Sequence, residues 1–252
     1  MSSPATPPAR SPRRVAIAVA ALVVAVVALV LAFTPSGDSD PKTKAKPKSS
    51  SGKTKPESSK PSPRDEALLA LARRDKSDQL AMGRADAPVV MIEYADYQCP
   101  FCSKFARDTE PELIRSYVGK GLLRIEWRNF PIFGKESEQA ARAAWAAGRQ
   151  QKFQEFHEQA YAKPHKRNTG AFAEDKLVVL ARAAGVPDLD RFRKDMNSAK
   201  AKAAVKRDMD EGMQLGVTST PAFLVNDKPI LGAQPVGSFK KAIKQAAQEA
   251  GR

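Results

Sequence analysis

The sequence predicts an α/β fold in which residues 64–252 form a β-α-β unit, a long helical insertion and a β-β-α unit, in that order. Short apolar runs of strand length occur near both ends of this region, and an alanine-rich stretch with helical periodicity lies between them. A strand, a helix and a second strand in one sheet form a right-handed parallel crossover. The chain has 252 residues, 42% of them apolar, which is enough for one large domain or two small ones.

The first unit follows a short helix that we expect at residues 65–74. Residues 87–95, APVVMIEYA, form a β-rich apolar run of strand length. Residues 102–118 have helical periodicity, and Pro111 within them predicts a kink. Residues 122–132 alternate apolar and polar side chains, so they predict the second strand.

A helical insertion is predicted at about residues 136–216, with breaks at KPHKRNTG and GVPD. Its aromatic residues are spaced for one apolar face, which indicates a packed helical layer rather than a cofactor site. They are Trp145, Phe153, Phe156 and Tyr161.

The second unit begins with a β-hairpin. PAFLV and KPIL flank the turn Asn226-Asp227, and Pro229 confines the second strand to an edge or end position. The segment GSFKKAIKQAAQEAG predicts a final helix with Ser238 as its N-cap and Gly251 at its end.

The N-terminus predicts a membrane segment. Residues 15–33 carry no charge or strongly polar group, and their number meets the requirement of about 20 for a spanning helix. A cleaved signal peptide is the alternative, but the apolar run is longer than a typical signal core and no A-x-A cleavage site follows it. Arg10, Arg13 and Arg14 precede the run, so we expect residues 1–14 to be a cytoplasmic tail and the rest of the chain to lie outside.

Residues 34–63 are rich in Pro, Ser and Lys and contain no large apolar side chain, so they predict a disordered linker. The net charge of the whole chain is +14, and residues 1–63 carry half of it, with 10 Lys and Arg against 3 Asp and Glu. The remaining region is therefore only mildly basic. Its charges lack an interleaved aromatic cluster, so nucleic-acid binding is not expected.

Cys99 and Cys102 are the only two cysteines, and they lie in the segment DYQCPFC. A helix that begins at Cys99 places its sulfur where free N–H groups and the helix dipole favour the thiolate. Cys102 is then one turn away, where it can form a small disulfide ring or attack a mixed disulfide. Pro100 is compatible with the first helical turn.

Two other interpretations of the cysteine pair are weaker. A zinc site would need two further ligands, and the two histidines, His157 and His165, lack the usual ligand spacing. A purely structural disulfide would close only a short loop and gain little chain entropy. No metal and no cofactor are therefore expected.

Three features together resemble the DsbA-like branch of the thioredoxin superfamily, the thiol–disulfide oxidoreductases of cell envelopes. They are MIEYADYQCPFC, the helical insertion and GVTSTPAFLVND, and the resemblance covers about residues 82–250. It implies a thioredoxin-like fold behind the membrane segment and linker. It also implies a redox-active Cys99-Cys102 disulfide, in which Cys99 is the exposed nucleophile and Cys102 the buried resolving thiol.

The resemblance extends to three further positions. The bond between Thr220 and Pro221 is expected to be cis, in a loop that faces the cysteines and holds an extended substrate. Glu93 matches a buried acid that tunes or relays protons for the second cysteine, although an exposed position at the strand edge is the alternative. Many family oxidases have His where this chain has Phe101, so we expect a weaker oxidant.

We therefore expect a single-pass membrane enzyme that exchanges disulfides with cysteine-containing exported proteins, as a dithiol oxidase reset by a membrane redox partner. A disulfide reductase or isomerase is the alternative direction. A non-catalytic chaperone that binds extended peptides through the Pro221 loop is an alternative from another class.

Overall fold

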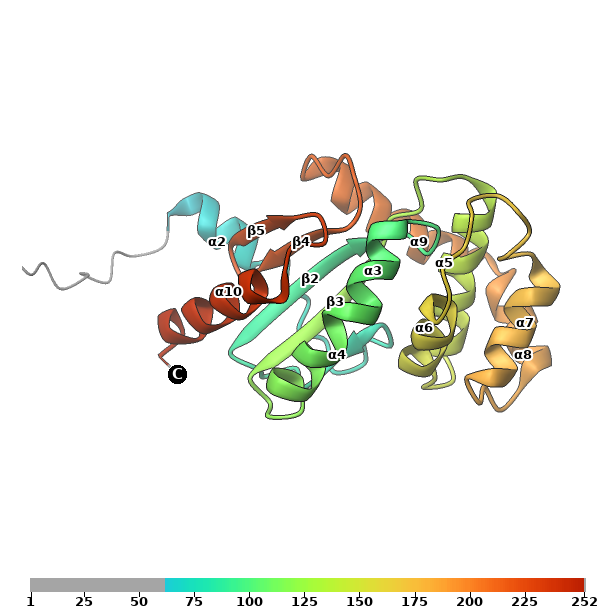
Figure 1. Ribbon diagram of the computed structural model, residues 1–252, viewed down its shortest axis with the longest axis horizontal. Helices are drawn as coiled ribbons and strands as arrows, with labels where there is room; N and C mark the ends of the chain where they lie inside the picture. Colours follow the sequence, from blue (N-terminus) through green and yellow to red (C-terminus); the bar gives the residue numbers. More distant parts are fainter. Residues whose placement is uncertain (1–61, 252) are drawn as a thin grey trace, which may run out of the picture. The chain divides into compact units, whose positions relative to one another are not determined.

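The computed structural model describes residues 62–251, and a mixed sheet with helices on both faces is its central feature (Figure 1). The strand order is β1-β3-β2-β4-β5. The strands are β1 (Ala81–Met82), β2 (Val89–Ala95), β3 (Leu123–Asn129), β4 (Ala222–Val225) and β5 (Lys228–Leu231).

Strand register confirms the predicted crossover and hairpin. β2 and β3 are parallel, with Val89 opposite Leu123 and Ala95 opposite Asn129. β4 is antiparallel to β2, and β4 and β5 form the hairpin around Asn226-Asp227. Pro229 lies on the edge strand β5, where the missing N–H removes no bond to a further strand.

One group of helices connects β2 to β3. The helices of the insertion lie side by side, and a last helix ends the described chain (Figure 1). The predicted helical insertion is confirmed, and it consists of five helices, α5 to α9. The helical elements are α2 (Pro63–Leu69), α3 (Pro100–Asp108), α4 (Glu110–Leu113), η1 (Ile114–Val118), α5 (Lys135–Gly148), α6 (Phe153–Tyr161), α7 (Glu174–Ala183), α8 (Leu189–Met196), α9 (Ala199–Gln214) and α10 (Val236–Glu249).

Three helix boundaries differ from the predictions. The helix expected at 102–118 is three elements, because Pro111 falls in the first turn of the new helix α4, and η1 then widens to a π-helix. The helix expected at 65–74 ends at Leu69, and the φ of +47° at Arg74 is incompatible with its continuation. Ser238 is not an N-cap, since α10 begins two residues earlier after Pro235.

Each face of the sheet has its own apolar core. One face carries Met91, Ile125 and Phe223, which pack in the larger core with side chains of α3, α10 and the insertion. The opposite face carries Val90, Ile92 and Tyr94 and packs against apolar side chains of α2, the segment after it, and α9. β2 is therefore buried along its whole length, which fixes the position of the residues that follow it.

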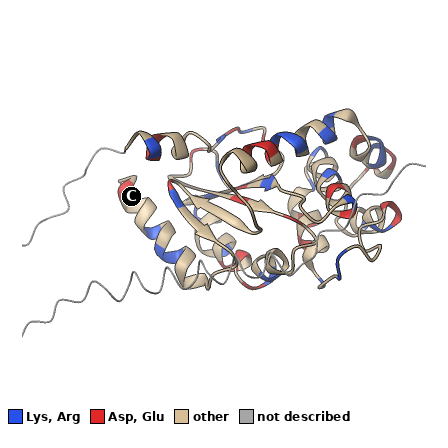
Figure 2. Cartoon of the chain, turned by 90° about the horizontal axis from the view of Figure 1, so that it is seen from above, with Lys and Arg blue, Asp and Glu red and all other residues tan. Residues whose placement is uncertain are grey.

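The predicted second strand is confirmed as β3. The polar side chains of its alternating sequence, Arg124, Glu126 and Arg128, are all buried. Glu126 forms ion pairs of 2.8 Å with both arginines, and this pairing makes burial of the charges tolerable. On the described surface, Lys and Arg are interspersed with Asp and Glu over most helices, as a mildly basic domain predicts (Figure 2).

The predicted tail, membrane segment and most of the linker lie outside the described residues. Within residues 62–251, none of the helices combines the length and the apolar character needed to cross a bilayer.

Candidate active site

The turn after β2 places Cys99 at the start of α3. Asp96 accepts hydrogen bonds from the backbone N–H groups of Gln98 and Ile132, both at 2.7 Å, and its carbonyl accepts one from the N–H of Cys99 at 3.0 Å. Cys99 is the N-cap residue and Pro100 occupies the first helical position. The predicted helix start is thus confirmed, and Asp96 is a turn residue as its position suggests.

The two sulfurs have opposite environments. The backbone N–H of Cys102 lies 3.4 Å from Sγ of Cys99, and both cysteines are free thiols here. A hydrogen bond from the Cys102 side chain, helped by the backbone N–H groups of Phe101 and Cys102, lowers the pKa of Cys99 to about 6 against the opposing effect of burial. Burial raises the pKa of Cys102 well above its ordinary value, and the hydrogen bond to Cys99 adds to this. The pair therefore favours one thiolate, on Cys99.

Cys99 is less exposed than the resemblance implies. Only 2% of its surface is accessible, against 0% for Cys102, and its sulfur contacts the Thr220 carbonyl. Cys99 does line a cavity of about 130 Å³. The cavity is also lined by Pro100, Ser103, Arg107, Pro164 and His165.

The Thr220-Pro221 segment lies against the first cysteine. The peptide bond is cis, as expected, and the Cys99 thiol donates a hydrogen bond to the Thr220 carbonyl at 3.2 Å. Pro221 directly precedes β4, which pairs with β2, so the sheet itself brings residues 121 positions apart into contact. The hydroxyl oxygen of Thr220 is buried without a hydrogen-bond partner.

Glu93 is buried in the middle of β2, so its alternative position at an exposed strand edge is wrong. It lies between Trp127 on β3 and Phe223 on β4, and its Oε2 has no hydrogen-bond partner. Burial raises the pKa of Glu93 well above its ordinary value, and the negative charges of Glu110 and Cys99 raise it further. A protonated carboxyl is the favoured form at this position.

The structure adds a buried pair that sequence patterns did not reveal. Nε2 of His157 lies 2.9 Å from a carboxylate oxygen of Glu110, and both side chains are almost fully inaccessible. The ring of Tyr97 packs edge-on against His157. His157 is a core residue, and its partner comes from α4, 47 positions away. No local spacing signals such a contact.

Comparisons with known proteins agree with this geometry. The probable disulfide bond formation protein D of Bacillus cereus is 33% identical over 171 residues, which cover 66% of this chain and 78% of that protein. Disulfide bond formation protein D of Bacillus subtilis is 26% identical over 169 residues, covering 66% and 76%. The crystal structure of oxidised BdbD from Bacillus subtilis has a TM-score of 0.64 at 25% identity and covers 69% of this chain and 95% of that one.

The fold and these similarities define a thiol–disulfide oxidoreductase with a thioredoxin-like architecture. The chain belongs to the thioredoxin family, because the family model described as Thioredoxin matches residues 75–245, more than half of its length.

Proposed function

We propose that the chain is a dithiol oxidase that transfers the Cys99-Cys102 disulfide to exported proteins. The observation that carries this proposal is the opposed environment of the two sulfurs, with the pKa of Cys99 lowered to about 6 and that of Cys102 raised by burial. A stabilised Cys99 thiolate stabilises the reduced enzyme. Because the reduced form is more stable, the disulfide form is a stronger oxidant.

The exchange proceeds in two steps. A client thiolate attacks Sγ of Cys99, a client–Cys99 disulfide forms, and Cys102 leaves as a thiolate that takes up a proton. A second client thiolate then attacks the client sulfur of this mixed disulfide, and the Cys99 thiolate leaves. Two client thiols become one disulfide while the enzyme disulfide becomes two thiols. The lowered pKa of Cys99 makes it the better leaving group in the second step.

Four further residues support these steps. The loop at Thr220 and Pro221 holds the client backbone beside Cys99, since its carbonyl already contacts that sulfur. Glu93 exchanges a proton with Cys102, because it is a buried carboxyl whose charged form is disfavoured by its surroundings. The ring of Phe101 is 61% exposed and offers the client an apolar contact next to the reactive sulfur.

The sequence supports a location of the catalytic domain outside the membrane. Residues 1–14, 15–33 and 34–63 serve as cytoplasmic tail, membrane anchor and linker, and the catalytic domain lies outside the membrane. The names of the relatives, disulfide bond formation protein D, support disulfide formation as the activity of this domain. A membrane redox partner reoxidises the cysteine pair.

A trapping experiment tests the roles of the two cysteines. In the Cys102→Ser variant the Cys99 thiolate can still attack a client disulfide, which forms a client–Cys99 disulfide and releases a client thiolate, but no second enzyme thiol is present to displace Cys99. Mixed disulfides should therefore accumulate through Cys99 and be visible as reducible adducts on non-reducing gels. The matched Cys99→Ser variant should form none. Adducts that appear only in the Cys99→Ser variant would reverse the assignment.

A further inference from the structure

The connection between α6 and α7 lies beside the reactive cysteine. Within it, Pro164 and His165 line the same cavity as Cys99. Asn168 makes two hydrogen bonds with Gln98, the residue before Cys99: its N–H donates to Oε1 at 2.6 Å, and its Oδ1 accepts from Nε2 at 3.2 Å. Residues 163–168, here called the basic loop, are therefore fixed next to the nucleophile.

A second contact holds the basic loop in place. The guanidinium of Arg167 lies 3.7 Å from the ring centre of Phe133, which belongs to the segment after β3. The side-chain amide of Gln98 donates to the carbonyl of Phe133 at 3.5 Å and to the hydroxyl of Ser137 on α5 at 2.9 Å. Cation–π stacking and these hydrogen bonds orient the loop before any client binds.

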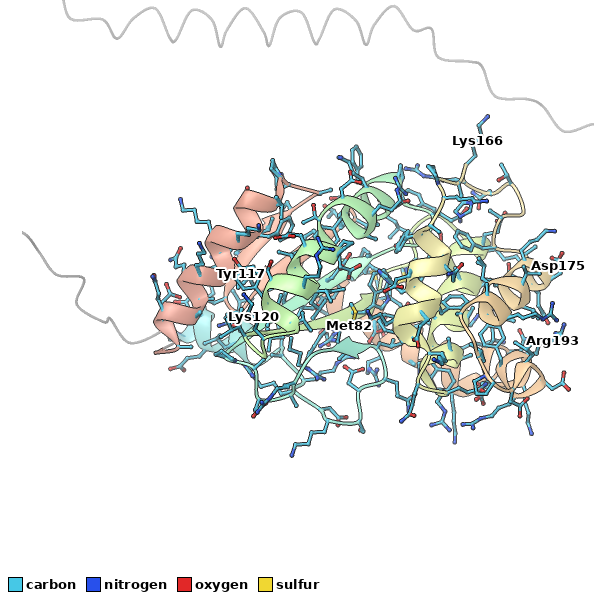
Figure 3. All side chains as sticks on the ribbon, turned by 60° about the horizontal axis from the view of Figure 1, so that its bottom comes forward. Met82, Tyr117, Lys120, Lys166, Asp175 and Arg193 are labelled. Atoms are coloured by element: carbon cyan, nitrogen blue, oxygen red, sulfur yellow. The ribbon has the colours of Figure 1, made fainter. Side chains whose placement is uncertain are left out.

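The basic loop presents unneutralised positive charge. The side chains of Lys163, Lys166 and Arg167 are exposed, and Figure 3 shows Lys166 extending outward from the domain. Among residues 62–251, none of the three forms a salt bridge, and the sequence has no Asp or Glu between residues 159 and 173. The carboxylate of Glu136 lies at the end of the connection that leads to α7, where it accepts hydrogen bonds from the N–H groups of Gly170 and Phe172.

A fourth cation lies in the wall of the cavity itself. The guanidinium of Arg107 is held by the hydroxyl of Ser103 and by the carbonyl of Tyr161, which it contacts at 3.3 Å. Positive charge therefore continues from the basic loop to the cavity that Cys99 lines.

We propose that the basic loop is a recognition surface for client segments with Asp or Glu next to the reacting cysteine. This inference rests on the proposed disulfide exchange and names the class of client that it favours. The placement carries the argument, because a client whose sulfur enters the cavity must bring its flanking residues against the loop. Exposed ion pairs of this kind are each worth little, so three cations should give a preference of about fivefold at low ionic strength.

The test compares three otherwise identical dithiol peptides that carry Glu, Gln or Lys on both sides of one cysteine. Their oxidation by the full-length oxidised chain is followed at low salt and at about 1 M salt. The test variant is Lys163→Gln with Lys166→Gln, which removes two exposed charges and leaves the stacked Arg167. The matched control is Lys194→Gln with Lys200→Gln, which removes two exposed charges from α8 and α9.

The acidic peptide should react about fivefold faster than the Gln peptide, and high salt or the loop variant should remove most of this preference. The control variant should retain it. Equal rates for all three peptides would overturn the recognition surface alone, and so would equal losses in both variants. An absence of oxidation with every peptide would overturn the proposed exchange as well. A loop variant that loses binding to vesicles of anionic lipid, yet keeps the peptide preference, would assign the charge to a membrane surface instead.

Discussion

The thiolate of Cys99 depends most on a neighbour three positions along the chain. Because the side chain of Cys102 makes the largest contribution to lowering the pKa of Cys99, a variant that removes this donor should raise it. In Cys102→Ala we expect the midpoint of the alkylation rate against pH to move from about 6 toward the ordinary cysteine value of about 8.5.

A serine at the same position separates the hydrogen bond from other effects. Cys102→Ser keeps a donor, so its midpoint should stay below that of Cys102→Ala. Alkylation of Cys99 with iodoacetamide, followed by mass spectrometry, measures both profiles. Equal midpoints for the two variants would show that the backbone N–H groups, rather than the side chain, stabilise the thiolate.

Glu93 should make the stability of the reduced protein depend on pH. Its pKa is raised in the folded state, so the folded protein holds this proton more tightly than the unfolded one. The free energy of unfolding therefore falls as pH rises above about 4.3, the unfolded value, until the folded pKa is passed. Glu93→Gln should stabilise the protein at about pH 8 by about 1 kcal/mol or more, and by less at about pH 4.

Urea unfolding of the reduced protein at both pH values measures this difference. The control is Glu138→Gln on the exposed side of α5. This substitution should have a small effect on the free energy of unfolding, and the effect should be the same at both pH values. A Glu93→Gln variant that loses stability equally at both values would mean that the carboxyl contributes packing rather than a protonation equilibrium.

Local spacing predicts some site residues and misses others. Cys99 and Cys102 are readable because one helical turn joins them, and Thr220-Pro221 is found only through the resemblance. Gln98, by contrast, holds the loop beside Cys99 by hydrogen bonds with Asn168. The two residues are 70 positions apart, and no periodicity links them. The exposure of Cys99 is mispredicted for the same reason, since its sulfur contacts Thr220, which is distant in sequence.

At the scale of elements, β3 shows where pattern rules end. Its alternation correctly predicts a strand, but the polar face is buried because the segment after α2 and helix α9 cover it. Glu126 accepts the N–H groups of Arg73 and Arg74 at 3.0 and 2.8 Å, and it pairs with Arg124 and Arg128 on its own strand. A strand pattern cannot show that backbone N–H groups from a distant segment will donate hydrogen bonds to a buried carboxylate.

This network predicts a large effect of one substitution. Glu126→Gln leaves the buried Arg124 without a charged partner and leaves Arg128 with Glu211 as its close one, so it should reduce the free energy of unfolding by about 3 kcal/mol or more. Chemical denaturation monitored by circular dichroism measures the change. Asp86→Asn breaks the exposed Arg84–Asp86 pair and should have no measurable effect, because water screens that pair. Similar losses in both variants would contradict the dependence on burial.

At the scale of the whole molecule, the order of units is predictable because each is marked by its own composition. The thioredoxin-like region is confirmed by its sheet order and by the family match over residues 75–245. The placement of the remainder relies on hydropathy and charge alone. An apolar run of 19 residues behind three arginines predicts an uncleaved anchor with the enzyme on the outer side.

Trypsin added to intact cells stripped of their wall tests this topology. The predicted linker contains Lys42, Lys44, Lys46 and Lys48, so the protease should cut there and release a catalytic domain that begins after the linker. A tag at the N-terminus should stay intact and sediment with the membrane, and a cytoplasmic control protein should also stay intact. Protection of the whole chain would place the domain inside. Release of the domain into the medium before any protease is added would mean that residues 15–33 are a cleaved signal, and that Cys99 acts on clients without a tether.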